Sequence, residues 1–204
     1  GRRLAGMLHW SRAGTGPRGR FVVRSIGVAA FLALAACATA GERVPPEGLR
    51  ISARDAEQTA YTRAVTWASD AVLRYVEGEA VAADGYVLPG QGAWRFIYGS
   101  AGREDELVVT VTPTTIEQEA RPRQSPPGFA LGDAALDDGW IDSPRALAMT
   151  GAGADGSPSS RPDATVSMLL VPLRPAQWLI RGWAGGEARQ WSVDARTGAL
   201  LAVE

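Results

Sequence analysis

The chain has 204 residues, of which 21 are basic and 22 acidic, and it contains a single histidine, a single cysteine and no lysine. Because His9 and Cys37 both precede the main body of the chain, that body cannot build a Ser-His-Asp or Cys-His nucleophile system, a histidine or thiolate zinc site, or lysine-dependent chemistry. Catalysis there would be limited to carboxylates, arginine, tyrosine and hydroxyl groups. We therefore expect no enzyme activity, no cofactor and no metal.

An apolar run at residues 26–36 follows residues 18–24, which contain three arginines. The run is too short to cross a bilayer as a helix, and a cationic stretch before a short apolar run is typical of an export signal. The last three residues of this run and the cysteine that follows it form Leu34-Ala35-Ala36-Cys37, which resembles the lipobox of bacterial lipoproteins at all four positions. The alternatives are a plain secretory signal cut after Ala-Cys-Ala and a buried core helix, but the only cysteine in the chain stands at the motif position.

The lipobox resemblance implies that residues 1–36 are a signal peptide and that Cys37 becomes the acylated first residue of the mature protein. Ala38 stands where an aspartate would signal inner-membrane retention, so the resemblance implies the periplasmic face of the outer membrane, with membrane lipid as a partner. More than one acyl chain gives stable anchoring, since each buried methylene contributes about 0.8 kcal/mol. The chain begins without an initiator methionine and Met7 is the first plausible start, so we expect residues 1–17 to reflect an over-extended or a truncated gene model.

Residues 37–50 contain Pro45-Pro46 and Gly48 and are predicted to form a tether, which leaves residues 51–204 as the folded domain. From Cys37 onward, 15 arginines stand against 22 acidic residues. This balance argues against nucleic acid as a partner, because nucleic acid requires a basic surface.

A helix is predicted to begin after Ser52, whose hydroxyl can cap it, and to end near Gly78. Its buried stripe is predicted from apolar residues at spacings of three and four, namely Tyr61, Val65, Ala68, Val72 and Tyr75. A second apolar line widens that face and consists of Ala60, Ala64, Trp67 and Ala71. The aromatic stripe could instead line a ligand groove, but core packing is the interpretation that we favour.

After Gly85 the apolar period changes to two, which predicts an antiparallel hairpin packed on the helix. In its first strand, residues Trp94, Phe96 and Tyr98 are predicted to face one way, and Arg95 and Ile97 the other. The connection to the next strand carries Glu104-Asp105-Glu106, which is predicted to be a solvated tip.

Three prolines within residues 121–128 divide the domain into predicted sub-units 51–120 and 129–204. An acidic cluster follows around Trp140 and comprises Asp133, Asp137, Asp138 and Asp142. Its spacing does not match the calcium loop of an EF-hand, but a pair of these carboxylates could act as acid and base in glycoside hydrolysis. We favour loop solvation and capping of a short helix that opens with Ser143-Pro144 and runs to Met149.

Strands are then predicted at residues 166–171, 178–183, 189–194 and 199–203, with a turn at Asp194-Ala195-Arg196-Thr197-Gly198 joining the last two. The two halves align at an offset of 84 residues, which places Trp94 on Trp178 and residues 59–65 on residues 143–149. A chance match of tryptophans in strands is the alternative. We therefore predict an α+β fold in which helices pack on antiparallel sheet, as two tandem helix-plus-hairpin units.

The order of helix, tryptophan-bearing strand, loop, strand, Asp-x-x-Thr-Gly turn and closing strand resembles a PepSY-like domain, a small α+β module related in architecture to β-lactamase inhibitor proteins. The resemblance is best over residues 177–203 and weaker in the first half, where residues 110–114 supply no Asp-x-x-Thr-Gly turn. It implies a module that binds or restrains other proteins without catalysing a reaction.

The leading hypothesis is thus a lipoprotein anchored in the outer membrane, whose non-catalytic α+β domain binds an envelope protein or a small ligand, or has a purely structural role. The candidate binding surface is the sheet face away from the helices, and the candidate residues are Trp94, Arg95, Trp178, Arg181 and Trp183, whose types are enriched at binding hot spots. Core packing is the alternative for the tryptophans, and we favour it for most of them. The alternative is a carboxylate-dependent hydrolase of cell-wall polysaccharide that uses Asp137, Asp138 or Asp142.

Overall fold

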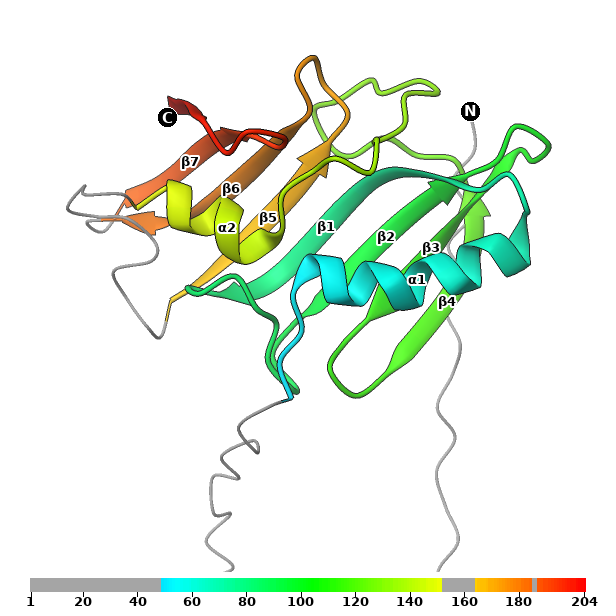
Figure 1. Ribbon diagram of the computed structural model, residues 1–204, viewed down its shortest axis with the longest axis horizontal. Helices are drawn as coiled ribbons and strands as arrows, with labels where there is room; N and C mark the ends of the chain where they lie inside the picture. The colour runs from blue at the N-terminus through cyan, green and yellow to red at the C-terminus, as the bar shows by residue number, and fades with distance from the viewer. Residues whose placement is uncertain (1–48, 152–163, 185–186) are drawn as a thin grey trace, which may run out of the picture. The chain divides into compact units, whose positions relative to one another are not determined.

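The computed structural model describes residues 49–151, 164–184 and 187–204 (Figure 1). These residues form an α+β domain in which two helices pack on one eight-stranded antiparallel sheet, and this confirms the predicted fold class. None of the helices among the described residues is long and apolar enough to cross a membrane. The predicted signal peptide, Cys37 and the tether up to residue 48 lie outside the described residues.

Each half of the domain contributes one helix followed by four strands. The elements are α1 (Ala53–Trp67), β1 (Val72–Ala82), β2 (Ala93–Gly99), β3 (Asp105–Val111), β4 (Ile116–Pro122), α2 (Ser143–Met149), β5 (Thr165–Val171), β6 (Gln177–Ala184), β7 (Glu187–Asp194) and β8 (Leu200–Val203). In the sheet the strands lie in the order β4-β3-β2-β1-β5-β6-β7-β8. The two halves are therefore joined edge to edge, where β1 pairs with β5.

The first helix is shorter than predicted. Ser52 caps it as expected, since its side chain accepts a hydrogen bond from the Asp55 N–H, but the helix ends at Trp67. The segment that follows forms strand β1, so the prediction that the helix continues to Gly78 was wrong. Val72 to Ala82 is rich in β-branched and aromatic residues and pairs on both sides in the sheet, and this pairing outweighs the three-and-four spacing on which the prediction relied.

The buried face of α1 is also not the predicted one. Tyr61 is 53% exposed and Val65 37% exposed, whereas the buried side chains are alanines, namely Ala53, Ala56, Ala60 and Ala64. The contact face therefore includes Ala60 and Ala64 of the second apolar line and extends towards the start of the helix through Ala56 and Ala53. Small side chains allow the helix to lie close to the large aromatic residues that the sheet presents to it.

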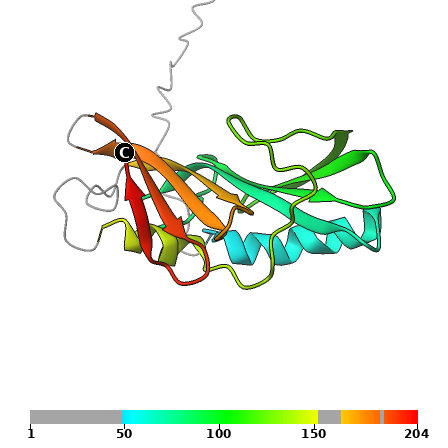
Figure 2. The same cartoon turned by 90° about the horizontal axis from the view of Figure 1, so that it is seen from above.

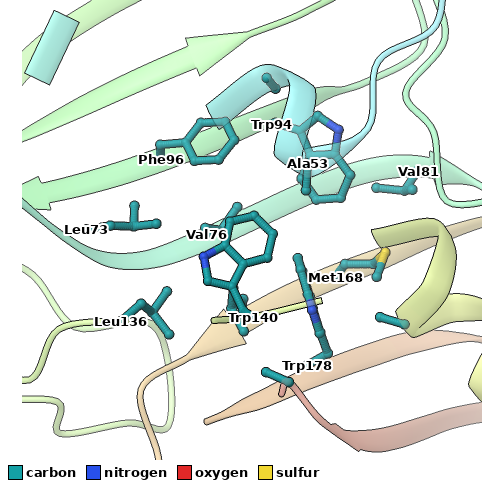
Figure 3. Packing of buried hydrophobic residues seen from close by; sticks show 14 of the residues in the cluster. Ala53, Leu73, Val76, Val81, Trp94, Phe96, Leu136, Trp140, Met168 and Trp178 are labelled. Carbon is teal, nitrogen blue, oxygen red and sulfur yellow. The ribbon is translucent and has the colours of Figure 1, made fainter. Parts of the chain in front are cut away.

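Both helices lie on the same side of the sheet, which we call the covered face (Figure 2). Trp94, Phe96 and Tyr98 project from β2 into the main core on this face, as the strand alternation predicted. Trp178 packs edge-to-face against both Trp94 and Trp140, with ring centroids 6.3 and 5.8 Å apart (Figure 3). Such aromatic pairs add to the stability that burial alone provides.

Each half of the domain has a tryptophan on its second strand, and the two tryptophans make equivalent hydrogen bonds. Nε1 of Trp94 donates to the Ile51 carbonyl at 3.1 Å, and Nε1 of Trp178 donates to the Ile141 carbonyl at 2.9 Å. Each carbonyl lies two residues before the first residue of its helix. The predicted offset of 84 thus pairs equivalent tryptophans and also places residues 59–65 of α1 on α2, although the two helices begin 90 residues apart, at Ala53 and Ser143.

The N-termini of the two helices meet at one carboxylate. Oδ1 of Asp142 accepts hydrogen bonds from the N–H groups of Ser143, at 2.7 Å, and Arg54, at 3.0 Å. The Ser143 hydroxyl in turn accepts from the N–H of Ala53 and donates to the carbonyl of Gly85. The predicted short helix is confirmed, but Asp142 rather than Ser143 is its N-cap.

The opposite side of the sheet, which we call the open face, carries a covering segment made of residues 123–134 (Figure 2). Leu131 of this segment packs with Phe129 on a second, smaller core. The sheet residues in that core are Tyr75, Ile97, Val108, Val171 and Leu179. The covering segment hides part of the open face and leaves the remainder accessible.

Candidate binding groove on the open face

The accessible part of the open face contains a groove that crosses β1, β5 and β6. Two hollows of about 540 and 350 Å³ form it, and they share Ser167 and Arg181 in their linings. Pro126 and Pro127 of the covering segment form one wall of the smaller hollow. Strand register explains the arrangement, because Ser167, Arg181 and Gln190 lie directly opposite one another on β5, β6 and β7 and therefore on one face.

Arg95 lies in the smaller hollow and is held by two acidic side chains of the neighbouring strand. Its Nη2 is 2.8 Å from Oε2 of Glu79, and its Nη1 is 4.0 Å from Oε2 of Glu77. The Arg95 side chain keeps 41% of its surface exposed. This guanidinium is positioned by its partners but remains in contact with solvent.

Arg181 is placed differently, although it lines both hollows. Its Nε donates to Oε1 of Gln190 at 2.6 Å, and no carboxylate of the described residues lies within ion-pair distance of it. Trp183, two residues further along β6, is 63% exposed, the most exposed of the large apolar side chains that the structure describes. A guanidinium that has no carboxylate partner among the described residues, beside an exposed indole, is the combination of side chains typical of binding hot spots.

The floor of the larger hollow includes a strained backbone position. Ala80 has φ of +50°, a conformation that side chains other than glycine rarely adopt, and it lies at the irregularity in the pairing of β1 with β5. A Cβ at Gly92 would come within 2.1 Å of the Glu79 carbonyl oxygen, so only glycine fits beside this bulge. Strain of this kind is commonly found next to functional sites.

The five predicted binding residues do not all lie at the groove. Arg95, Arg181 and Trp183 line it, whereas Trp94 and Trp178 are fully buried in the core of the covered face. The prediction was therefore wrong for these two tryptophans as surface residues. Side-chain alternation is the reason, since Trp178 and Trp183 are separated by an odd number of positions on β6 and face opposite ways.

Most of the acidic residues around Trp140 make contacts within the fold, and one of them, Asp137, lines a small hollow together with Asp194. Asp142 caps both helices, and Oδ1 of Asp137 accepts from the Gly139 N–H at 2.9 Å. Asp133 forms an ion pair with Arg123, and Asp138 is exposed. Within the described residues no group of three or more potential metal ligands is present.

Sequence reasoning missed a buried ionic cluster beneath the covering segment. Glu106 was predicted to lie in a solvated tip, but it is fully buried on β3. Its two oxygens pair with Nη1 of Arg74, at 3.1 Å, and Nε of Arg121, at 2.9 Å. Glu106 stands two residues before Val108, so strand alternation places both side chains on the same face of the sheet. This spacing is the sequence signal that could have revealed the buried glutamate.

The same cluster includes a tyrosine with an altered acidity. Nη2 of Arg121 donates to the Tyr75 hydroxyl at 3.3 Å. Burial, followed by the negative charges of Glu106 and Glu77, raises the pKa of Tyr75 to about 12. Burial is the largest single influence on Arg121 and opposes its charged form, but the hydrogen bonds and charges of Glu106 and Tyr75 together outweigh burial and raise the pKa of Arg121. The cluster therefore pairs the Glu106 carboxylate with two guanidinium groups and keeps the Tyr75 phenol neutral.

Comparison with known proteins adds little to this description. No family model and no curated protein matches the chain. The crystal structure of a candidate lipoprotein from Clostridium difficile 630 is similar to it, with 13% identity over 72% of this chain and 91% of that chain and a TM-score of 0.49. We base no functional conclusion on this likeness, and the PepSY-like resemblance stays a prediction.

Proposed function

We propose that this chain is a lipoprotein of the bacterial envelope whose α+β domain binds an envelope protein through the open-face groove. The observation that carries the proposal is the pairing of Arg181, which has no carboxylate partner among the described residues, with the exposed Trp183 in one groove. The partner that fits this chemistry is a polypeptide segment with an acidic side chain for Arg181 and an apolar side chain for Trp183.

The groove is preformed, which supports binding rather than a purely structural role. Arg95 is fixed by Glu79 and Glu77, and Arg181 by Gln190. Side chains that already have their bound positions lose little conformational entropy when a partner arrives. The covering segment supports the same reading, since it fills the other part of the open face and leaves this part accessible.

The lipoprotein part of the proposal rests on the lipobox resemblance at residues 34–37. A cationic stretch, a short apolar run and a cysteine after two alanines are the features that it requires. The residue after the cysteine, Ala38, favours the outer membrane, and the tether would let the domain reach partners on the periplasmic side.

Membrane fractionation and intact-mass measurement of the expressed chain test the anchor, with Cys37→Ser as the comparison. We expect the unmodified sequence to yield a membrane-bound product that begins at Cys37 and carries acyl mass, and the variant to lose both properties. A soluble, unacylated product from the unmodified sequence would contradict the anchor.

Size-exclusion chromatography of the complex after gentle detergent extraction tests the groove. Arg181→Glu reverses the charge at the proposed contact, and we expect it to shift the protein from a complex to its free size. Arg63→Glu is the matched control, because Arg63 is exposed on α1 on the covered side of the sheet. If both variants retain the complex, or both lose it, the groove is not the binding site.

A further inference from the structure

The eight-stranded sheet ends in two edge strands whose chemistry differs. β4 lies at one edge and β8 at the other, so each has one side that no strand of the described residues pairs with (Figure 1). Edge strands expose backbone N–H and C=O groups that can pair with a further strand, and proteins commonly block such edges with charged residues or proline. A comparison of the two edges therefore shows which of them is able to accept another strand.

The β4 edge is blocked in this way. The strand contains Glu117, Glu119 and Arg121 and ends at Pro122. The two glutamates are exposed. A row of charged side chains resists the approach of an apolar strand, and proline lacks the N–H group that pairing requires.

The β8 edge has no such protection. Residues 199–203 are Ala-Leu-Leu-Ala-Val and contain neither a charged residue nor a proline. Leu200, Leu201 and Val203 are nevertheless 45, 45 and 49% exposed. An apolar, uncharged edge strand of this kind is a site for association with another strand.

The apolar surface continues from β8 onto the covered face of the sheet. Leu200 and Val203 lie opposite core residues of β7, so both side chains are on the covered face. Met149, the last residue of α2, is also exposed, and its Cγ would lie 3.4 Å from a Cβ added at Gly198, in the turn before β8. Exposed apolar side chains from a helix and a strand therefore gather at this corner of the domain.

The backbone of β8 also has groups that face the free edge. Glu204 exchanges two hydrogen bonds of 2.8 Å with Gln190 of β7. In antiparallel strands, hydrogen-bonded and non-hydrogen-bonded pairs alternate. The N–H and C=O groups of the preceding residue, Val203, are therefore directed away from β7, where an added strand could bond to them.

From the apolar edge, its free backbone groups and the contrast with β4, we infer that β8 pairs with β8 of a second copy of this chain. The two copies form a two-fold dimer in which the sheet is continuous. Antiparallel pairing about an axis through the middle of the strand places Leu200 of one protomer beside Val203 of its partner, on the covered face. The contact is self-complementary, as a two-fold interface requires, and residues 199–203 bring no charges together.

The chain's own segments outside the described residues fit this edge less well than a second copy. Residues 152–163, which follow α2 in the sequence, contain no large apolar residue. The contact between two copies is small, because β8 has four residues. We therefore expect a reversible dimer with a dissociation constant of about 1–100 μM, as for interfaces below the standard size. Arg181 and Trp183 take no part in it, so the dimer and the groove are tested separately.

Cysteine crosslinking of the full chain in cells tests the dimer. Ala202→Cys places a thiol close to the proposed two-fold axis, and Gln118→Cys places one on the exposed β4 edge as the matched control. The unmodified chain, whose single cysteine is Cys37, gives the background. We expect mild oxidation to produce a disulfide-linked species of twice the mass from position 202 alone.

Charged substitutions in the Ala202→Cys background show whether the apolar contact carries the association. Leu200→Glu and Val203→Glu each place a carboxylate in the proposed interface and should lower the yield of crosslinked dimer at least about tenfold. Ile116→Glu is the control on the other edge, where Ile116 is 42% exposed, and should leave the yield unchanged. Arg181→Glu should leave it unchanged as well, which separates the dimer from the groove.

Equal dimer yields from positions 202 and 118, an adduct of position 202 with a different protein, or a yield that both charged substitutions leave unchanged would overturn the inference. Sedimentation velocity of the unmodified, purified full chain keeps the test informative if a variant fails to fold. The mass should rise towards twice that of the monomer as the concentration increases from about 1 to 200 μM. A mass that stays at the monomer value over this range would contradict the dimer.

Discussion

The two faces of the sheet use the same kinds of residue for opposite purposes. On the covered face, Trp94 and Trp178 are fully buried and each donates its indole N–H to a backbone carbonyl. On the open face, Trp183 is mostly exposed beside Arg181. Trp178 and Trp183 belong to the same strand, so the difference between the core residue and the candidate binding residue is one of alternation and of what covers each face.

The largest expected effects concern the buried groups of the two faces. Trp178→Ala removes a side chain that packs against two other tryptophans and should lower the free energy of unfolding by about 3–5 kcal/mol. Urea unfolding followed by far-UV circular dichroism measures this change. A loss below about 1 kcal/mol would show that the covered face is not the main core.

Glu106→Gln tests whether the open face also has a buried part that the fold requires. The substitution leaves Arg74 and Arg121 without their shared carboxylate, and we expect a loss of about 3–5 kcal/mol, as for other buried ion pairs that lose one partner. Glu104→Gln is the control, because Glu104 is exposed two positions away. Equal stability of the two variants would mean that the cluster does not stabilise the covering segment.

Asp142→Ala separates the capping role from the hydrolase alternative. Because one carboxylate caps both helices, we expect the stability to fall by about 1–2 kcal/mol for each cap that is lost. Asp138→Ala should change stability by less than about 0.5 kcal/mol, since the side chain is exposed. A polysaccharide hydrolase activity that either substitution abolishes in a folded protein would revive the alternative.

The pH dependence of stability sharpens the description of the open face. The pKa of Tyr75 is about 12 in the fold, above its ordinary value near 10, so the neutral phenol contributes stability that is fully present below about pH 10 and is lost as the pH rises toward 12. The chain has no lysine, which leaves tyrosines as the main groups that titrate in this range. Urea unfolding between pH 8 and about 12 should show a shallower decline for Tyr75→Phe than for the unmodified protein.

Burial also raises the pKa of Tyr98, with smaller contributions from Glu57 and Tyr61. Part of the loss of stability at high pH should therefore persist in the Tyr75→Phe variant. If the unmodified protein and Tyr75→Phe lose stability in parallel, Tyr75 is not the group that titrates.

The smallest expected effect completes the comparison of the two tryptophans on β6. Trp183→Ala should change the free energy of unfolding by less than about 0.5 kcal/mol, because the indole contributes little to the folded core. The same unfolding measurement as for Trp178→Ala checks it. A loss of several kcal/mol would place Trp183 in the fold rather than in a binding surface.

The sequence predicted the strands of the second half and the turn at residues 194–198 because alternation and turn residues are local signals. Oδ1 of Asp194 accepts from the N–H groups of Thr197 and Arg196, which holds the pKa of Asp194 below its usual value, and Gly198 takes φ of +81°. These interactions span a few residues and can be inferred without knowledge of the rest of the fold.

The errors have a different origin, since they concern long-range pairing. Strand β1 was assigned to the helix because its apolar residues also fit a helical spacing, and only the two neighbours that it pairs with decide the outcome. Glu106 was assigned to a solvated loop because its partners, Arg74 and Arg121, lie 32 and 15 residues away. At the candidate site, the residue types were predicted, but which tryptophan faced outward depended on the position of the helices.

Photo-crosslinking in living cells tests the central claim most directly, that the open face binds a partner and the covered face does not. A photoreactive residue is placed at Ser167, in the groove, and in a second strain at Tyr61, which is exposed on α1. We expect one discrete adduct from position 167, which disappears when Arg181→Glu is added and persists with Arg63→Glu, and none from position 61. An adduct from position 61 alone, or an adduct at position 167 that Arg181→Glu leaves unchanged, would contradict it.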